Sequence, residues 1–292
     1  MLSVVAPMHN EVGNARAVYQ AIAAVLGRLG EPYEIIFVND ASTDETLSVI
    51  KDIQSQDRHF HYADLETNVG ENWALLAGIS KAVGDIVITI DGDGQNDPAY
   101  IPDLLAELSK GCRAVSGWRK GRIGGLWSRR LPSLVANYLI RKISGVRVHD
   151  CGCGLKAYRR EVIEGKFVPR GFMNRFSPVV FGVRDHEFAE VAIVDRPRPS
   201  GSSHYGLGRV FIVFRDLLAL PFALRGAEKW RACFYRLQWI SLALALFFVA
   251  RRQSAPLLAA GITALYSLSI HTNLRRFLDA QLNPPFRIRE FY

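Results

Sequence analysis

Short apolar runs alternate with amphipathic stretches along the first half of the chain. Four runs have the length and the β-branched content of buried strands: SVVAP (3–7), YEIIFVND (33–40), HFHYADLE (59–66) and DIVITIDGD (85–93). Residues 14–29 and 71–83 lie between these runs and repeat apolar side chains at helical spacing. Strands separated by helices predict βαβ units, and therefore an α/β fold with a mostly parallel sheet.

Polar residues cluster where three of these predicted strands end, at Pro7–Glu11, Asn39–Asp44 and Asp91–Asp97. Ligands of parallel sheets bind beyond the carboxyl ends of the strands. We therefore expect the three segments to converge on one cleft.

The pattern changes after residue 110. Residues 113–125 predict a strand that runs into a basic, glycine-rich loop, and residues 126–143 predict a helix interrupted by Pro132. The apolar segment 209–225 carries arginine at both ends, which is typical of an interfacial amphipathic helix. A helix buried in a core is the alternative for this segment.

Two apolar runs follow, at residues 237–250 and 255–270. Each is shorter than the roughly 20 residues of a full membrane span, but their pairing and basic flanks favour a short transmembrane hairpin over a soluble helical pair. Basic residues flank the hairpin on both outer sides, which predicts that both ends of the hairpin are cytoplasmic. Arg251 and Arg252 in the connection weaken this prediction, because the rule expects few basic residues on the other side of the membrane. The expected segments are an α/β domain (residues 1–206), interfacial helices (207–236), the hairpin (237–271) and a cytosolic tail (272–292).

Charge is divided unevenly between the two parts of the chain. Residues 1–110 carry 6 Lys/Arg and 17 Asp/Glu, whereas the remaining residues carry 30 and 11. The acidic part suits a cation, and the basic part suits anions or a membrane surface. No aromatic side chains interleave with the basic residues as in nucleic-acid-binding proteins, so we expect no nucleic-acid partner. The four cysteines fit a reducing compartment, and no secretory signal is expected at the start.

The segment TIDGDGQNDP (89–98) crowds three carboxylates directly after a predicted strand. An EF-hand loop starting at Asp91 would need Gly at its sixth position and Glu at its twelfth, where this chain has Asn96 and Pro102. A phosphatase-type Asp-x-Asp nucleophile would more naturally be followed by Thr or Val than by Gly94. The pattern favours Asp91 and Asp93 as ligands of Mg²⁺ or Mn²⁺ shared with a diphosphate, with Gln95 adding a contact. A solvated acidic turn is the alternative.

The segment HDCGCG (149–154) offers a second metal hypothesis, a zinc ion on His149, Cys151 and Cys153. No further ligand pair follows at a suitable spacing. A tight glycine-rich turn, with Asp150 and Lys156 facing the cleft, is therefore the favoured interpretation.

Six motifs occur in the order and spacing of inverting glycosyltransferases with the GT-A fold: VVAPMHNE, FVNDASTDET, NVG, TIDGDGQNDP, SGWRK and DCGCGLKAYRREV. Over residues 1–225 the sequence most resembles the polyprenol-phosphate glycosyltransferases, including dolichol-phosphate mannosyltransferase-like proteins. The resemblance implies a Rossmann-like GT-A catalytic domain, followed by interfacial helices and a short hydrophobic helical hairpin.

The resemblance also implies roles for individual residues. Asp91, Asp93 and Arg119 match the catalytic residues, and Asp91 and Asp93 with Gln95 match the metal site. Donor-binding positions are matched by Pro7, His9, Asn10, Glu11, Asp40, Asp44, Asn68, Gly70 and Asp91. Positions near the acceptor phosphate are matched by Arg119, Arg130, Arg198, Ser202, Ser203 and His204.

The sequence departs from the family pattern at several of these motifs. His9 stands where Tyr is frequent, Asn39-Asp40-Ala41 replaces Asp-Asp-Gly, and Glu71 replaces Lys or Arg, which leaves the nucleobase open. Asp195 replaces a frequent His. His204 replaces Lys and would make phosphate binding depend on pH near neutrality.

The implied function is metal-dependent transfer of a hexose, mannose or glucose, from a GDP- or UDP-sugar to a polyprenyl phosphate, with inversion. A lipid monophosphate is already largely anionic at pH 7, since its second pKa is about 6, so it needs cations to orient it more than a general base. The catalytic domain would face the cytoplasm at a membrane, and a homo-oligomer is compatible with the sequence. The alternatives are a glycosyltransferase with a saccharide or protein acceptor and a non-catalytic membrane scaffold.

Overall fold

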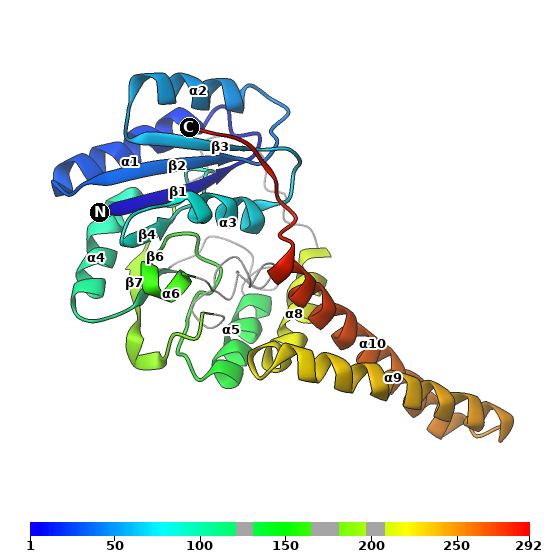
Figure 1. The fold of residues 1–292 in the computed structure, drawn as a ribbon. Coiled ribbons are helices and arrows are strands. Elements are labelled where there is room, and N and C mark those ends of the chain that lie inside the picture. Colours follow the sequence, from blue (N-terminus) through cyan, green and yellow to red (C-terminus); the bar gives the residue numbers. More distant parts are fainter. Residues whose placement is uncertain (121–130, 165–180, 197–207) are drawn as a thin grey trace. The chain divides into compact units, whose positions relative to one another are not determined.

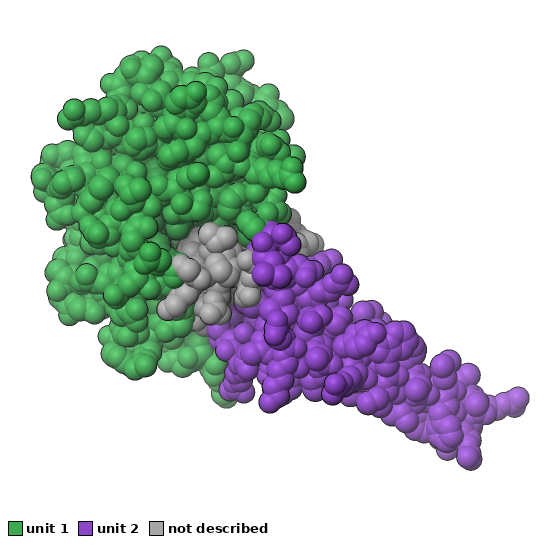
Figure 2. Space-filling model, in the orientation of Figure 1, with its two compact units in different colours: residues 1–204, 284–292 green, residues 205–283 purple. Residues whose placement is uncertain are grey.

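The computed structural model describes residues 1–120, 131–164, 181–196 and 208–292. The chain divides into two compact units (Figure 2). The first, here called the sheet unit, consists of Met1–His204 and Pro284–Tyr292. The second, here called the helical unit, consists of Tyr205–Asn283.

The described strands of the sheet unit form one sheet in the order β7-β5-β6-β4-β1-β2-β3-β8. Figure 1 shows β1, β2 and β3 of this sheet side by side. Four neighbouring pairs are parallel, namely β1 with β2, β1 with β4, β2 with β3 and β5 with β7. The pairs β3 with β8, β4 with β6 and β5 with β6 are antiparallel. The strands are β1 (Leu2–Met8), β2 (Tyr33–Asn39), β3 (Phe60–Leu65), β4 (Ile86–Thr89), β5 (Ala114–Arg119), β6 (Lys156–Arg159), β7 (Phe188–Ile193) and β8 (Ile288–Phe291).

Helices cover both faces of this sheet, which explains why the central strands read as continuous apolar runs. Ile35 and Phe37 of β2 pack into one core cluster, and Ile36 and Val38 pack into the other. The first cluster lies under α1 (Ala15–Leu29), α2 (Thr46–Gln56) and α4 (Ile101–Ser109), and the second lies under α3 (Glu71–Lys81) and α6 (Arg160–Ile163). The mostly parallel α/β sheet predicted from the sequence is confirmed.

The helix predicted over residues 126–143 is described from Leu131, as α5 (Leu131–Ser144). Pro132 is the second residue of this range, and residues 121–130 lie outside the described residues, so the interruption at Pro132 stays a prediction.

The helical unit contains α8 (Gly208–Leu224), α9 (Ala227–Ala250) and α10 (Ser254–Leu282). α9 and α10 run side by side as a hairpin (Figure 1). Among the described residues, these are the two helices that are long and apolar enough to cross a membrane. Only 11% of the most apolar stretch of α9 and 28% of that of α10 is buried. α8 contacts both of these helices, and its residues Leu217, Ala219 and Leu220 are buried.

The helices of the hairpin extend beyond the apolar runs on which the sequence prediction rested. α9 begins ten residues before the first run, and α10 continues past the predicted boundary at residue 271 to Leu282. Residues 288–291, expected in a tail, form β8 and pair with β3 at one edge of the sheet. Four residues carry too little periodic signal to predict such a strand.

Candidate functional site

The predicted convergence of the three polar segments is present at the carboxyl ends of β1, β2 and β4. The Asn10 amide donates a hydrogen bond to the Ser42 hydroxyl at 3.0 Å, and Asn10 Oδ1 accepts one from the Thr43 amide at 2.8 Å. Gly92 joins the third segment to this group, since a Cβ placed there would lie 2.3 Å from the Pro7 carbonyl oxygen. The approach of the two backbones therefore requires glycine at position 92.

His9 bridges two of the predicted donor-binding segments. Its Nδ1 lies 2.8 Å from the Asp40 carbonyl oxygen, to which it donates. The Asn68 side-chain amide lies 3.0 Å from His9 Nε2. The structure thus brings together His9, Asp40 and Asn68, as the resemblance implied, although their roles toward a ligand stay predictions.

Asp40 fastens the loop that carries Asn68 and Gly70. Its two carboxylate oxygens accept hydrogen bonds from the Val69 and Gly70 amides, both at 2.8 Å. Gly70 has a φ of 88°, a conformation that favours glycine. The buried Asp40 carboxylate therefore fixes the loop after β3 against the end of β2.

Asp44 and Glu11 hold the start of α2 and the loop before α1. Asp44 accepts hydrogen bonds from the amide and hydroxyl of Thr46, and from the Val12 amide at 3.3 Å. Burial alone would raise the pKa of Asp44, but these hydrogen bonds outweigh it and lower the pKa below its ordinary value. The Glu11 amide donates to the Thr46 hydroxyl at 2.9 Å. The Asp44 carboxylate and the Glu11 backbone amide thus tie the loop before α1 to the start of α2.

Ala41 lies in the same loop with a φ of 48°, where the resembled family has glycine. A left-handed conformation costs a residue with a Cβ about 1 kcal/mol relative to glycine. We expect Ala41→Gly to raise the free energy of unfolding by about that amount and to raise the melting temperature of the purified protein. Ala24→Gly, at an exposed position of α1, is the matched control and should lower it by about 1 kcal/mol. A lower melting temperature for Ala41→Gly would contradict the assignment of strain.

The loop after β4 is held by contacts within it and from distant parts of the chain. The Asp91 amide donates to Asn96 Oδ1 at 3.3 Å, and the Gln95 amide donates to Asp93 Oδ1 at 3.0 Å. Gly154, from the glycine-rich turn, lies against Asp91 so closely that a Cβ there would be 1.9 Å from Asp91 Oδ1. Asp91 and Asp93 are therefore positioned by their own loop, and Asp91 also by the turn before β6.

The third acidic residue of the motif has a different role. Asp97 forms an ion pair with Arg196 at 2.5 Å, and its Oδ1 accepts the Ala99 amide at the start of the short helix η1 (Pro98–Tyr100). The Arg196 amide also donates to the Gln95 carbonyl oxygen at 2.7 Å. Asp97 and Arg196 thus close the loop.

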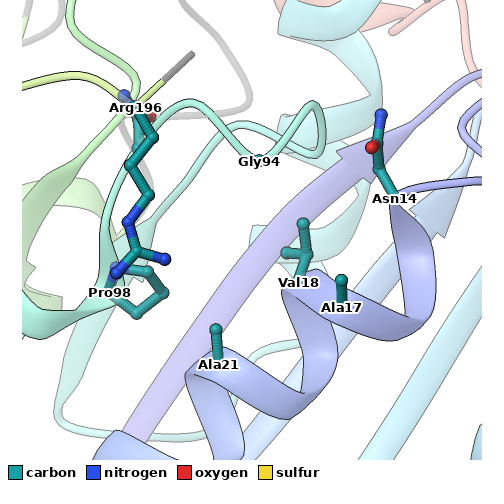
Figure 3. A pocket seen from close by; sticks show the side chains of 8 residues that line it. Asn14, Ala17, Val18, Ala21, Gly94, Pro98 and Arg196 are labelled. Carbon is teal, nitrogen blue, oxygen red and sulfur yellow. The ribbon is translucent and has the colours of Figure 1, made fainter. Parts of the chain in front are cut away.

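A small cavity adjoins this loop, with a volume of about 120 Å³ (Figure 3). It lies between α1 and the loop, and its lining includes Ala17, Val18, Gly94 and Arg196. Ligand pockets usually measure about 300–1,000 Å³. The cavity is therefore too small for a nucleotide sugar.

Asp91 lies in an unusual electrostatic environment. Its pKa is raised well above the ordinary value by burial, and the carboxylates of Glu71 and Asp93 raise it further. Arg119 and Lys156 oppose this shift. A divalent cation would favour the charged carboxylate at this position.

The buried cation Arg119 lies within a network that reaches Asp91. Its guanidinium donates to Asp150 at 2.6 and 2.9 Å and lies 3.7 Å from Asp195, which accepts from Asn96 at 3.2 Å. Burial alone would lower the pKa of Arg119, but the hydrogen bonds and charge of Asp150 raise it. Lys156, also buried, donates to the Cys151 carbonyl oxygen at 3.1 Å. Asn96 and Asp195 were not predicted as site residues, since only their contact across 99 residues reveals them.

Several predicted residues near the acceptor phosphate, namely Arg130, Arg198, Ser202, Ser203 and His204, lie outside the described residues. The zinc alternative gains no support, because the described residues contain no group of three or more His, Cys, Asp or Glu side chains arranged to hold a metal ion. Burial raises the pKa of the Cys151 and Cys153 thiols to about 12. The Asp91–Asp93 pair suits a different kind of site, in which carboxylates and substrate phosphates share the cation.

Comparison with known proteins identifies the class to which this arrangement belongs. Residues 3–166, more than half of the chain, match the model of Glycosyl transferase family 2. The chain belongs to glycosyl transferase family 2. The prediction of a glycosyltransferase is therefore confirmed.

Two relatives of this family-2 glycosyltransferase align over most of its length. A dodecaprenyl-phosphate galacturonate synthase of Rhizobium johnstonii is 39% identical over 228 residues, which cover 77% of this chain and 67% of the relative. An undecaprenyl-phosphate 4-deoxy-4-formamido-L-arabinose transferase of Pectobacterium atrosepticum is 32% identical over 218 residues, 74% of this chain and 66% of the relative. The chain thus spans about two thirds of the length of these relatives.

Solved structures support the fold of the family-2 glycosyltransferase. One of them is a glucosyl-3-phosphoglycerate synthase from Mycobacterium tuberculosis, solved with Mn²⁺, uridine diphosphate and glucosyl-3-phosphoglycerate. It aligns with this chain with a TM-score of 0.57 and 22% sequence identity, and the alignment covers 76% of this chain and 78% of the synthase. At this identity the likeness concerns the fold alone. The GT-A fold predicted from the motifs is confirmed.

Proposed function

We propose that this glycosyltransferase transfers a sugar from a nucleotide-sugar donor to a polyprenyl phosphate, with inversion and with Mg²⁺ or Mn²⁺. The observation that carries the proposal is the Asp91–Asp93 pair, positioned by Gly154 and Asn96 at the carboxyl edge of the sheet. The two relatives are named as transferases to dodecaprenyl and undecaprenyl phosphate, which supports this acceptor class.

The donor binds to residues from the ends of β1, β2 and β3 in this proposal. Asn10 and Asp40 belong to segments tied together by hydrogen bonds, so they are positioned before a ligand arrives. Asp91 and Asp93 would hold the metal ion, with Gln95 beside them. The bound metal ion would stabilise the negative charge that develops on the leaving nucleoside diphosphate.

The acceptor phosphate supplies the attacking oxygen. Because a phosphate monoester is already anionic at pH 7, the protein needs mainly to bind and orient it, and Arg119 contributes positive charge beside the metal-binding loop. Asp150 and Asp195 hold the Arg119 guanidinium in place. Arg130, Arg198, Ser202, Ser203 and His204 are proposed as further contacts to this phosphate on the resemblance alone. Direct in-line attack would invert the anomeric carbon.

The hairpin of α9 and α10 is proposed as the membrane anchor, with the catalytic domain on the cytoplasmic side. Large apolar side chains such as Trp239, Leu246, Leu258 and Leu265 are exposed along both helices. Isolated exposed apolar residues are ordinary, whereas a surface of this extent fits a membrane or a protein partner. A lipid acceptor favours the membrane.

The sugar is the finer part of the proposal. A hexose such as mannose or glucose is expected from the family resemblance, whereas the two relatives are named for galacturonate and a formamido-arabinose. The donor panel in the test therefore has to include a uronic acid and an amino-pentose derivative beside UDP-glucose and GDP-mannose.

The test measures glycolipid formation by the full-length protein in detergent. Each donor is offered with Mg²⁺ or Mn²⁺ and an undecaprenyl phosphate, and the matched control acceptor is undecaprenol, which lacks the phosphate. We expect product from one donor, only with metal and only with the phosphate. Product with a saccharide acceptor but none with the lipid phosphate would overturn the proposed acceptor. No nucleotide binding with Mn²⁺ would favour a non-catalytic scaffold.

A further inference from the structure

The C-terminal strand β8 contacts a buried carboxylate next to the donor-binding segments. Arg289 of β8 lies with Nη1 3.1 Å from Oδ2 of Asp64 on β3. The Asp64 side chain is 3% exposed and the Arg289 side chain is 60% exposed. A cation at the surface thus balances a carboxylate within the sheet unit, and losing one member of such a pair leaves the other poorly compensated.

Asp64 passes this contact to the end of β2. Its Oδ1 accepts a hydrogen bond from the Asn39 side-chain amide at 2.7 Å, and the two residues are register partners in the parallel pair of β2 and β3. An ionised carboxylate only accepts hydrogen bonds. It therefore selects the orientation of the Asn39 side chain in which the NH₂ group faces Asp64.

That orientation directs the other end of the Asn39 amide toward the donor-binding loop. Asn39 Oδ1 accepts a hydrogen bond from the Ser42 amide at 3.3 Å. The Ser42 hydroxyl in turn accepts one from the Asn10 amide at 3.0 Å. A continuous chain of contacts therefore links Arg289, near the C-terminus, to Asn10 at the end of β1.

We propose that Arg289 is a positioning residue for the nucleotide-sugar donor, acting through Asp64 and Asn39 on the loop 40–44 and on Asn10. This inference rests on the proposed function, because it assigns the loop to donor binding. Without the guanidinium, the Asp64 carboxylate loses its cation, and the orientation of the Asn39 amide is less strongly selected. The loop then samples arrangements that do not bind the donor.

Other contacts attach β8 to the sheet unit without touching Asp64. Lys51 of α2 forms an ion pair with Glu290 at 2.8 Å, and the backbones of Tyr62 and Tyr292 exchange hydrogen bonds at 2.9 and 3.1 Å. Lys51→Ala therefore weakens the attachment of the strand and leaves the Arg289–Asp64 contact in place. It is the matched control for loss of a β8 ion pair.

The experiment measures the dissociation constant of UDP or GDP, whichever the wild-type full-length protein binds, by calorimetry with Mn²⁺. We expect Arg289→Ala to raise it about fivefold and to raise the donor KM with little change in kcat or in the KM of the lipid acceptor. Arg289→Lys should recover part of the affinity, since it restores the charge. Lys51→Ala should bind the nucleotide like the wild type.

A double-mutant cycle tests the route through Asp64. In Asp64→Asn the buried carboxylate is absent, so adding Arg289→Ala should then have no further effect on nucleotide affinity. If Arg289→Ala weakened nucleotide binding equally in the wild-type background and in the Asp64→Asn background, the inference would be overturned. It would also be overturned if Arg289→Ala and Lys51→Ala bound the nucleotide with equal affinity. If the wild-type protein bound no nucleotide, both the proposed function and the inference would be overturned. If the wild type bound the nucleotide and transferred the sugar, and Arg289→Ala changed neither, the inference alone would be overturned.

Discussion

Replacing Asp93 by asparagine is expected to lower kcat about 10³-fold, with the fold retained. Asn still offers the Oδ1 acceptor that receives the Gln95 amide at 3.0 Å, so the loop keeps its internal hydrogen bond. What is lost is a negative charge next to Asp91, and with it much of the attraction for a divalent cation. Steady-state kinetics and Mn²⁺-dependent nucleotide binding of the purified variant check this.

The matched control is the same substitution four residues later. Asp97→Asn removes a charge from the same loop, but Asp97 pairs with Arg196 and caps the helix η1. Asn caps a helix as well as Asp does, so this variant keeps the cap and weakens only the ion pair with Arg196. We expect a small fall in melting temperature, corresponding to at most about 1 kcal/mol for an exposed ion pair, and metal-dependent nucleotide binding that is largely intact. Equal losses of activity in the two variants would refute the assignment of the metal to Asp91 and Asp93.

The second large effect is expected from Gly154→Ala. The added Cβ would lie 1.9 Å from Asp91 Oδ1 and 2.1 Å from its Cγ, so either the turn or the carboxylate has to move. The turn is held by the Thr89 hydroxyl, which donates to the Gly154 carbonyl oxygen at 2.7 Å. We expect the Asp91 side chain to be displaced and kcat to fall about 10²-fold, as for a catalytic group misplaced by about 1 Å.

Gly152→Ala is the control for this substitution, because it lies in the same turn. Its nearest contact would be the Arg119 Nη2 atom at 3.3 Å, so a shift of a few tenths of an ångström relieves the contact, far less than Gly154→Ala requires. We expect a small effect on kcat and on Mn²⁺-dependent nucleotide binding. If Gly154→Ala behaved like Gly152→Ala, the close packing against Asp91 would have no bearing on catalysis.

The fold was predictable because its signals are local. The strands with both faces covered appear as uninterrupted apolar runs, as in residues 33–40, and the first helix shows its buried positions at regular spacing. The convergence of Asn10, Ser42 and Thr43 followed from the rule that parallel strands end at one edge. These predictions needed only periodicity and the direction of the strands.

The remaining features depend on contacts between residues far apart in the chain. No local pattern indicates that Asn96 binds Asp195, or that Gly154 packs on Asp91. The different roles of Asp93 and Asp97 are also hidden, since both are aspartates in one short acidic loop. Only the partner of each carboxylate, Arg196 in the case of Asp97, distinguishes them.

The return of the chain into the sheet has a consequence for its topology. β3 and β8 are hydrogen-bonded neighbours, yet the whole of the hairpin, α9 and α10, lies between them in the sequence. Strands paired in one sheet are necessarily in the same aqueous compartment. Any bilayer that the intervening segment crosses must therefore be crossed an even number of times, so a total of one crossing, with one helix of the hairpin passing and the other not, is incompatible with this sheet.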